Sequence, residues 1–315
     1  MNESLKLKKM EKENKNEEIL KKYKLRDRAV KVLSKDGRFR AAMVKNTNAA
    51  KAAQDKHNLH FLPAFIMARA LASASLMSSF LKGEERIVIE VNGSGIINYL
   101  LVEAMQVGEV RGYVRYDNEL INEPFDSLSD LFGAGTFKVI KILYNKKEPQ
   151  TSVISIQKGD IESEIIKYYS QSEQIQTSIM LEVEIDDNGM ITQSGGIIVQ
   201  ALPGTKKKDI QKISRQLKET KSIGKYFNEG LTPDKALKEI LPFEFDIICR
   251  TPVDFFCRCS KENFISKLLT LEHKEIQEIH DSGQNELVCQ YCNSKYELNE
   301  MDFLKLLEET KAKRN

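Results

Sequence analysis

The chain has 315 residues, and its 48 basic and 46 acidic side chains leave a formal net charge of only +2. Hydrophobic residues make up 41% of the sequence, which is enough for a folded core. Because basic and acidic residues are nearly equal in number, the net charge argues neither for nor against nucleic-acid binding. A length of 315 residues predicts two domains, with room for a third small one.

Residues 1–24 carry eight lysines and five glutamates, with few apolar residues. We interpret this segment as a charged tail, either a solvated helix or a disordered stretch. It lacks the apolar region of a secretory signal, and its acidic residues are not typical of a transit peptide. Since no uncharged run reaches the ~20 apolar residues of a membrane span, we expect a cytoplasmic protein that does not contact a membrane.

Residues 25–204 show alternating strand and helix patterns. A strand is predicted at 39–44 and an Ala-rich helix at 47–56. A buried helix is predicted at 62–81, where Pro63 suits the first turn. Further strands, two of them joined by an Asn-Gly-Ser-Gly hairpin turn, are predicted at 85–91, 97–105, 110–116, 137–144, 151–157, 178–186 and 195–202. The pattern predicts an α+β core domain with a largely antiparallel sheet and packed helices.

Residues 205–248 are highly charged, and their sparse apolar positions have helical spacing, as at Ile210, Ile213 and Leu217. Thr232 and Pro233 are typical of the start of a further helix. We predict a helical connector of modest stability here. A small cysteine-rich module at 249–300 and an amphipathic helix or tail at 301–315 complete the expected organisation.

Four of the five cysteines form two tight pairs, Cys257-x-Cys259 and Cys289-x-x-Cys292, with 29 residues between the pairs. Stable disulfides are rare in the cytosol, so paired cysteines there indicate metal or redox chemistry. Zinc prefers four ligands in a tetrahedron and accepts thiolates readily. The spacing therefore predicts one zinc ion per chain, held by these four cysteines.

The alternative is four buried free cysteines that behave as small apolar side chains. Two tight pairs argue against it. His273 and His280 lie between the pairs and are candidate ligands, but with four thiols present we interpret them as surface residues of a helix at 272–279. Cys249 is interpreted as a small core residue.

Four thiolates leave no open position on zinc for water, so hydrolytic chemistry is not expected. The two sulfurs of each pair could reach each other and close a disulfide under oxidation. Oxidation would consume the metal ligands. Because zinc contributes on the order of 10–16 kcal/mol to the stability of such small sites, its loss should unfold the module.

Three further segments occur in order ahead of the cysteines: VNGSGIINYLLVEAMQVGEVRGYV at 91–114, KYYSQSEQIQT at 167–177 and GGIIVQALPG at 195–204. With the F-x-C-x-C and C-x-x-C pairs, this set resembles the 33 kDa chaperonin family of redox-regulated heat-shock holdases. Each motif alone is weak, but the ordered set is specific. The resemblance covers about residues 25–298.

The resemblance implies a zinc-bound, inactive state in the reducing cytoplasm. Under oxidative stress, disulfides Cys257–Cys259 and Cys289–Cys292 are expected, with release of zinc and loosening of the connector. The activated chain is then expected to bind unfolding client proteins without nucleotide, as a homodimer, in the stress response.

A zinc-ribbon protein that binds nucleic acid is the alternative function. Arg258, Lys261, Tyr291 and Lys295 would suit it, although acidic residues lie beside them. An enzyme is not expected, because Gly93-Ser94-Gly95 and Gly133-Ala134-Gly135 complete neither a nucleophile elbow nor a dinucleotide loop.

Overall fold

The structure is a computed structural model that describes residues 26–119, 128–220 and 222–312. The chain forms two compact units, Met1–Phe255 and Phe256–Asn315, which we describe separately. The predicted charged tail at 1–24 lies outside the described residues.

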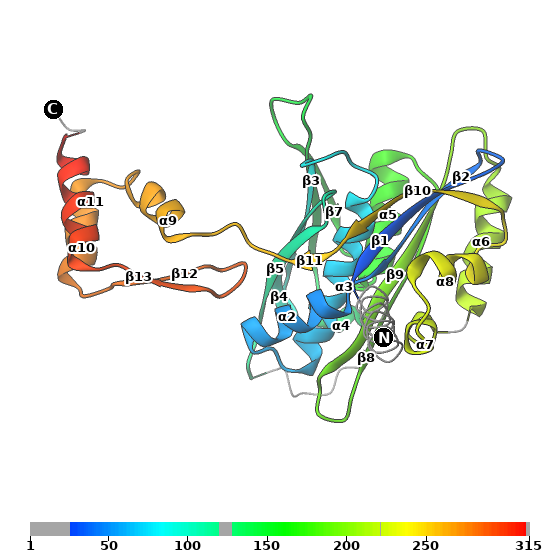
Figure 1. Ribbon diagram of the computed structural model, residues 1–315, viewed down its shortest axis with the longest axis horizontal. Coiled ribbons are helices and arrows are strands. Elements are labelled where there is room, and N and C mark those ends of the chain that lie inside the picture. Colours follow the sequence, from blue (N-terminus) through cyan, green and yellow to red (C-terminus); the bar gives the residue numbers. More distant parts are fainter. Residues whose placement is uncertain (1–25, 120–127, 221, 313–315) are drawn as a thin grey trace, which may run out of the picture. The chain divides into compact units, whose positions relative to one another are not determined.

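Antiparallel sheets form most of the described part of the first unit (Figure 1). A five-stranded sheet has the order β10-β1-β2-β9-β8, with bounds β1 Arg28–Ser34, β2 Phe39–Lys45, β8 Thr177–Ile185, β9 Ile191–Ala201 and β10 Phe245–Pro252. A six-stranded sheet has the order β11-β5-β4-β3-β6-β7, with bounds β3 Arg86–Gly93, β4 Ile97–Met105, β5 Glu109–Tyr116, β6 Gly135–Ile142, β7 Gln150–Ser155 and β11 Asp254–Phe255. The short β11–β5 pair is parallel. The predicted α+β class is confirmed.

Helix α3 (Phe61–Ser78) lies between the two sheets and contacts strands of both. Within the described residues, α3 is the one helix that is long and apolar enough to span a membrane. However, 89% of its apolar window is buried inside the first unit. Helix α2 (Thr47–His57) packs beside it, and α4 (Leu128–Phe132), α5 (Ile161–Tyr168) and the π-helical turn η2 (Tyr169–Glu173) follow. The predicted buried helix is confirmed as a core helix that is apolar on all sides.

Arg69 is the one basic residue of α3, and its guanidinium is buried but well partnered. It donates to the Leu181 carbonyl at 3.0 Å and to Asp160 Oδ1 at 2.9 Å, and Glu162 lies 3.5 Å away. A buried charge with these partners does not carry the desolvation cost of an unpaired one. The arginine therefore fixes α3 to α5 and β8.

Three connector helices cover the outer face of the five-stranded sheet (Figure 1). They are α6 (Lys207–Glu219), α7 (Ile223–Asn228) and α8 (Pro233–Ile240). Together with the sheet they form a second apolar cluster, separate from the core around α3. Its fully buried members from the strands are Val30, Val32, Ala41, Met43, Ile197 and Val199. The short connector helices thus cover an apolar face of the five-stranded sheet.

Asp27 joins the start of β1 to two other elements. Its Oδ2 accepts from the Ala49 N–H at 2.9 Å, at the beginning of α2, and its carbonyl accepts from the Val253 N–H, just after β10. The side chain is almost fully buried. Burial raises the pKa of this carboxyl to about 7, against the opposing effects of backbone N–H donors and Lys45.

The raised pKa of Asp27 predicts that this residue favours the folded state less as pH rises. Between its unfolded value of 3.8 and about 7, the folded chain holds a proton that the unfolded chain has lost. Stability of the first unit should therefore fall by about 2–3 kcal/mol from pH 5 to pH 8 on account of Asp27. Urea unfolding of wild type and Asp27→Asn across this range measures the difference. Parallel pH profiles for the two proteins would contradict the assignment.

Candidate metal centre

The two cysteine pairs of the second unit lie on two different local structures. Cys257 and Cys259 occupy the extended segment that follows β11 and leads into α9 (Lys261–Leu268). Ser260 caps this helix, because its hydroxyl accepts from the Asn263 N–H. This cap sets the start of α9 directly after the segment that carries Cys257 and Cys259.

Cys289 and Cys292 occupy the tight turn between β12 (Glu286–Val288) and β13 (Lys295–Glu297). The Cys289 carbonyl accepts from the backbone N–H of Cys292 and of Asn293, and Asn293 has a positive φ of 55°. Asparagine tolerates this left-handed conformation better than most residues. The turn directs both sulfurs to the same side.

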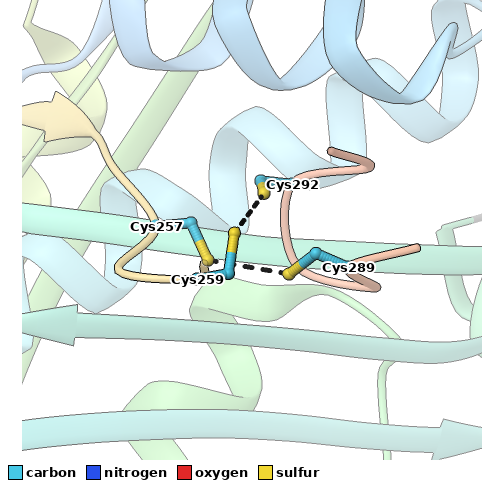
Figure 2. Close-up of side chains that lie close together, drawn as sticks. All are labelled: Cys257, Cys259, Cys289 and Cys292. Carbon is cyan, nitrogen blue, oxygen red and sulfur yellow. Dashed lines mark hydrogen bonds between the residues drawn. The ribbon is translucent and has the colours of Figure 1, made fainter. Parts of the chain in front are cut away.

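All four sulfurs converge, as Figure 2 shows, and lie within 4.8 Å of one another. The Cys257 and Cys289 sulfurs are 3.7 Å apart, and the Cys259 and Cys292 sulfurs are 3.4 Å apart. With zinc–sulfur bonds of ~2.3 Å, the sulfurs of a tetrahedral site would be separated by about 3.8 Å. The spacing therefore fits one four-coordinate metal ion, and the donor set of four thiols suits zinc.

The second unit has only a small apolar core of its own. Helices α10 (His273–Asp281) and α11 (Glu300–Ala312) pack against each other, and the fully buried apolar residues are Ile276, Leu298, Phe303 and Leu306. Modules of this size usually need a metal or disulfide in addition to their core. The four-cysteine cluster is where such a cross-link would lie.

The family model for "Hsp33 protein" matches residues 27–299, which span the core, the connector helices and the cysteine cluster. The chain belongs to the Hsp33 family. It is therefore a chaperone by family, as the resemblance of its sequence motifs had indicated.

Hsp33 relatives match nearly the whole chain. The 33 kDa chaperonin of Bacillus velezensis is 31% identical over 289 residues, covering 90% of this chain and 99% of the relative. That of Bacillus subtilis is 32% identical over 275 residues, covering 86% and 94%. The crystal structure of the 33 kDa chaperonin from Thermotoga maritima superposes with a TM-score of 0.80 at 27% identity, covering 90% of this chain and 98% of the other.

Two thiols of the cluster in this Hsp33 chain, Cys289 and Cys292, differ in acidity. Burial raises the pKa of Cys289 to about 12. Burial also disfavours the thiolate of Cys292, but contacts with the Ser294 hydroxyl and backbone outweigh it and lower that pKa to about 7. Of these two thiols, Cys292 is therefore the one whose thiolate form is favoured by its surroundings.

Two hydroxyl groups touch the cluster that the sequence pattern did not reveal. The Tyr296 hydroxyl lies 3.2 Å from the Cys259 sulfur, and the Ser294 hydroxyl lies 3.2 Å from the Cys292 sulfur. Both residues belong to the segment just after the second pair. For Ser294, the proximity in sequence to Cys292 was a signal that could have identified it, whereas the contact of Tyr296 is with Cys259, 37 residues away.

The remaining candidates lie away from the four sulfurs. His273 Nδ1 is 3.2 Å from the Thr310 hydroxyl, and His280 lies between Asp281 and Glu300. These acidic partners raise the pKa of His280. Both histidines are on α10, but both are half-buried and not exposed surface residues as we predicted. Cys249 is on strand β10, where it is half-buried and not part of the fully buried core that we expected.

Proposed function

We propose that this chain is a redox-regulated holdase that binds unfolding proteins without nucleotide. The observation that carries the proposal is the convergence of four thiols in a unit that has little core of its own. Membership of the Hsp33 family and the chaperonin names of its relatives support the chaperone part. No catalytic step is part of the proposal.

We assign the metal ligands to Cys257, Cys259, Cys289 and Cys292, with one Zn²⁺ per reduced chain. When bound, zinc would hold the sulfurs as thiolates and tie the two pairs together. The proposed oxidised form has disulfides Cys257–Cys259 and Cys289–Cys292. Their formation removes all four ligands, releases the ion and destabilises the second unit.

The connector helices supply a latent apolar surface for clients. Helices α6, α7 and α8 have 13, 6 and 8 residues, and isolated helices shorter than ~12–15 residues are marginal in water. Their stability depends on packing against the sheet, and their loosening would uncover the apolar strands beneath them. We propose this face, centred on Met43 and Ile197, as the client surface of the active form.

Further features of the proposal follow the family. We propose a cytoplasmic protein that forms a homodimer on activation, with a core, a connector and a zinc module. The sequence predicted these at 25–204, 205–248 and 249–300, but residues 245–255 form β10 and β11 in the sheets of the first unit, so the zinc module that we propose begins at Phe256. The nucleic-acid alternative is not favoured, because Lys295 pairs with Glu286 at 3.1 Å and Lys261 pairs with Asp302. These pairs neutralise the cations that a phosphate backbone would need.

Treatment of the reduced, metal-loaded protein with hydrogen peroxide tests the mechanism. We expect one zinc ion to be released per chain as four thiols disappear, with suppression of client aggregation rising in parallel. A chromogenic chelator, a thiol reagent and light scattering of a denatured client follow the three quantities. Client protection that is already complete in the reduced protein, or that never follows zinc release, would contradict the proposal.

A further inference from the structure

We propose that Tyr296 is a positioning residue that slows oxidation of Cys259, so that its hydroxyl helps to set how readily the metal centre opens. This inference rests on the proposed function, because it concerns the reactivity of the same four sulfurs. The Ser294 hydroxyl, 3.2 Å from the Cys292 sulfur, slows oxidation of Cys292 in the same way. The structure thereby assigns one hydroxyl to the second cysteine of each pair.

Tyr296 reaches from β13 across to the first cysteine pair. Its hydroxyl donates to the Cys259 carbonyl at 3.0 Å and lies 3.2 Å from the Cys259 sulfur. The ring packs against Phe264 of α9, with ring centroids 5.5 Å apart. The side chain is thus held at both ends, and its hydroxyl contacts sulfur and backbone of one cysteine 37 residues away.

The direction of the hydrogen bond follows from the state of the sulfur. A thiolate has no proton to give, so in the reduced, metal-loaded form the single Tyr296 O–H proton is shared between two acceptors, the Cys259 carbonyl and the Cys259 sulfur. A donated hydrogen bond withdraws electron density from sulfur and weakens it as a nucleophile. Burial does not protect this pair, because Cys257 and Cys259 are only half-buried whereas Cys289 and Cys292 are buried. The hydroxyl therefore acts on the more accessible pair.

The step that Tyr296 would slow is the attack of the Cys259 thiolate on hydrogen peroxide. A sulfur–oxygen bond forms, the O–O bond breaks, and hydroxide leaves, which gives a sulfenic acid. The Cys257 thiolate then attacks that sulfur, forms the disulfide and expels a second hydroxide. Two electrons pass from the two sulfurs to peroxide, and two protons from solvent convert the hydroxides to water.

The test compares Tyr296→Phe, which keeps the ring on Phe264, with wild type. Reduced, metal-loaded full-length protein is treated with peroxide and quenched with an alkylating agent at early times. Peptide mass spectrometry then gives the initial rates of loss of Cys259 and Cys292. We expect Tyr296→Phe to speed loss of Cys259 about three- to tenfold while leaving Cys292 nearly unchanged.

Two further variants separate a local effect from a general loosening. The readout is the initial rate of loss of Cys259 divided by that of Cys292. Ser294→Ala should lower this ratio, because it should speed loss of Cys292. Tyr291→Phe makes the same chemical change within the second pair but keeps the backbone N–H that donates to the Cys289 sulfur, so its ratio should match wild type. An unchanged ratio in Tyr296→Phe, or equal acceleration of all four cysteines, would overturn the inference. Client protection is not the readout, so failure of the proposed holdase function would show itself separately.

Discussion

Replacing Cys289 by serine is expected to abolish tight metal binding and to unfold the C-terminal unit. The substitution removes one of four ligands and leaves a neutral hydroxyl at a position buried among the other three sulfurs. Loss of groups that merely support a metal ligand costs ~10–100-fold in affinity, so loss of a ligand itself should cost more than about a hundredfold. Metal content after dialysis and competition with a chelator measure the change.

The matched control is Cys249→Ser. Cys249 is half-buried on β10 in the first unit, and the same atom is exchanged there without touching the cluster. It should keep one zinc ion per chain and wild-type hydrogen exchange in the second unit. Cys289→Ser should lose amide protection across α10 and α11, because the core that remains around Ile276 and Phe303 is small. Full metal content in Cys289→Ser would show that the ligand set is wrong.

The cysteine cluster could be predicted from sequence because its signal is local and chemical. Each pair has a spacing that keeps two sulfurs close together on the local backbone, an extended segment for the first pair and a turn for the second. Four thiols also have few other uses in a reducing compartment. Tyr296 could not be predicted in the same way. Its contact with Cys259 spans 37 residues, and a lone tyrosine in a three-residue strand carries no spacing pattern.

Strands with one buried face were also readable from sequence, whereas β1 and β10 were not predicted. Strand β1 carries apolar residues on both faces: Val30 and Val32 face the connector helices, whereas the opposite face has buried Ala29 and the exposed Leu33. The alternation of apolar and polar residues that identifies a half-buried strand is therefore missing. In the edge strand β10, the exposed Ile248 interrupts the alternation that its neighbours show.

The connector was identified by its charge and helical spacing, but its partner surface was not. Sequence periodicity shows that a helix has an apolar face without showing what covers it. Only the register of β2 shows that Ala42 and Val44 face α3 while Ala41 and Met43 face the connector. Because the two apolar clusters lie on opposite faces of the sheet, loosening of the connector helices would leave the core around α3 intact.

Shortening Leu237 to alanine should therefore activate the chaperone without oxidation. Leu237 is fully buried on α8, which packs on β1 and β2. Removing a buried leucine side chain costs about 2–5 kcal/mol, and the loss falls on a helix of eight residues that has little stability alone. In the reduced, metal-loaded state, Leu237→Ala should bind an apolar fluorescent dye and suppress client aggregation, whereas wild type should do neither.

Glu239→Ala is the matched control, because it makes an equally helix-compatible substitution on the exposed face of the same helix. It should leave dye binding and client protection at the wild-type level. Zinc content of both variants should remain one per chain, since the cysteines belong to the other unit. If Leu237→Ala loosened the connector, seen as lost amide protection in α6–α8, and still failed to protect clients while reduced, the sheet face beneath the connector would not be the client surface. Oxidation would then have to expose a different part of the chain.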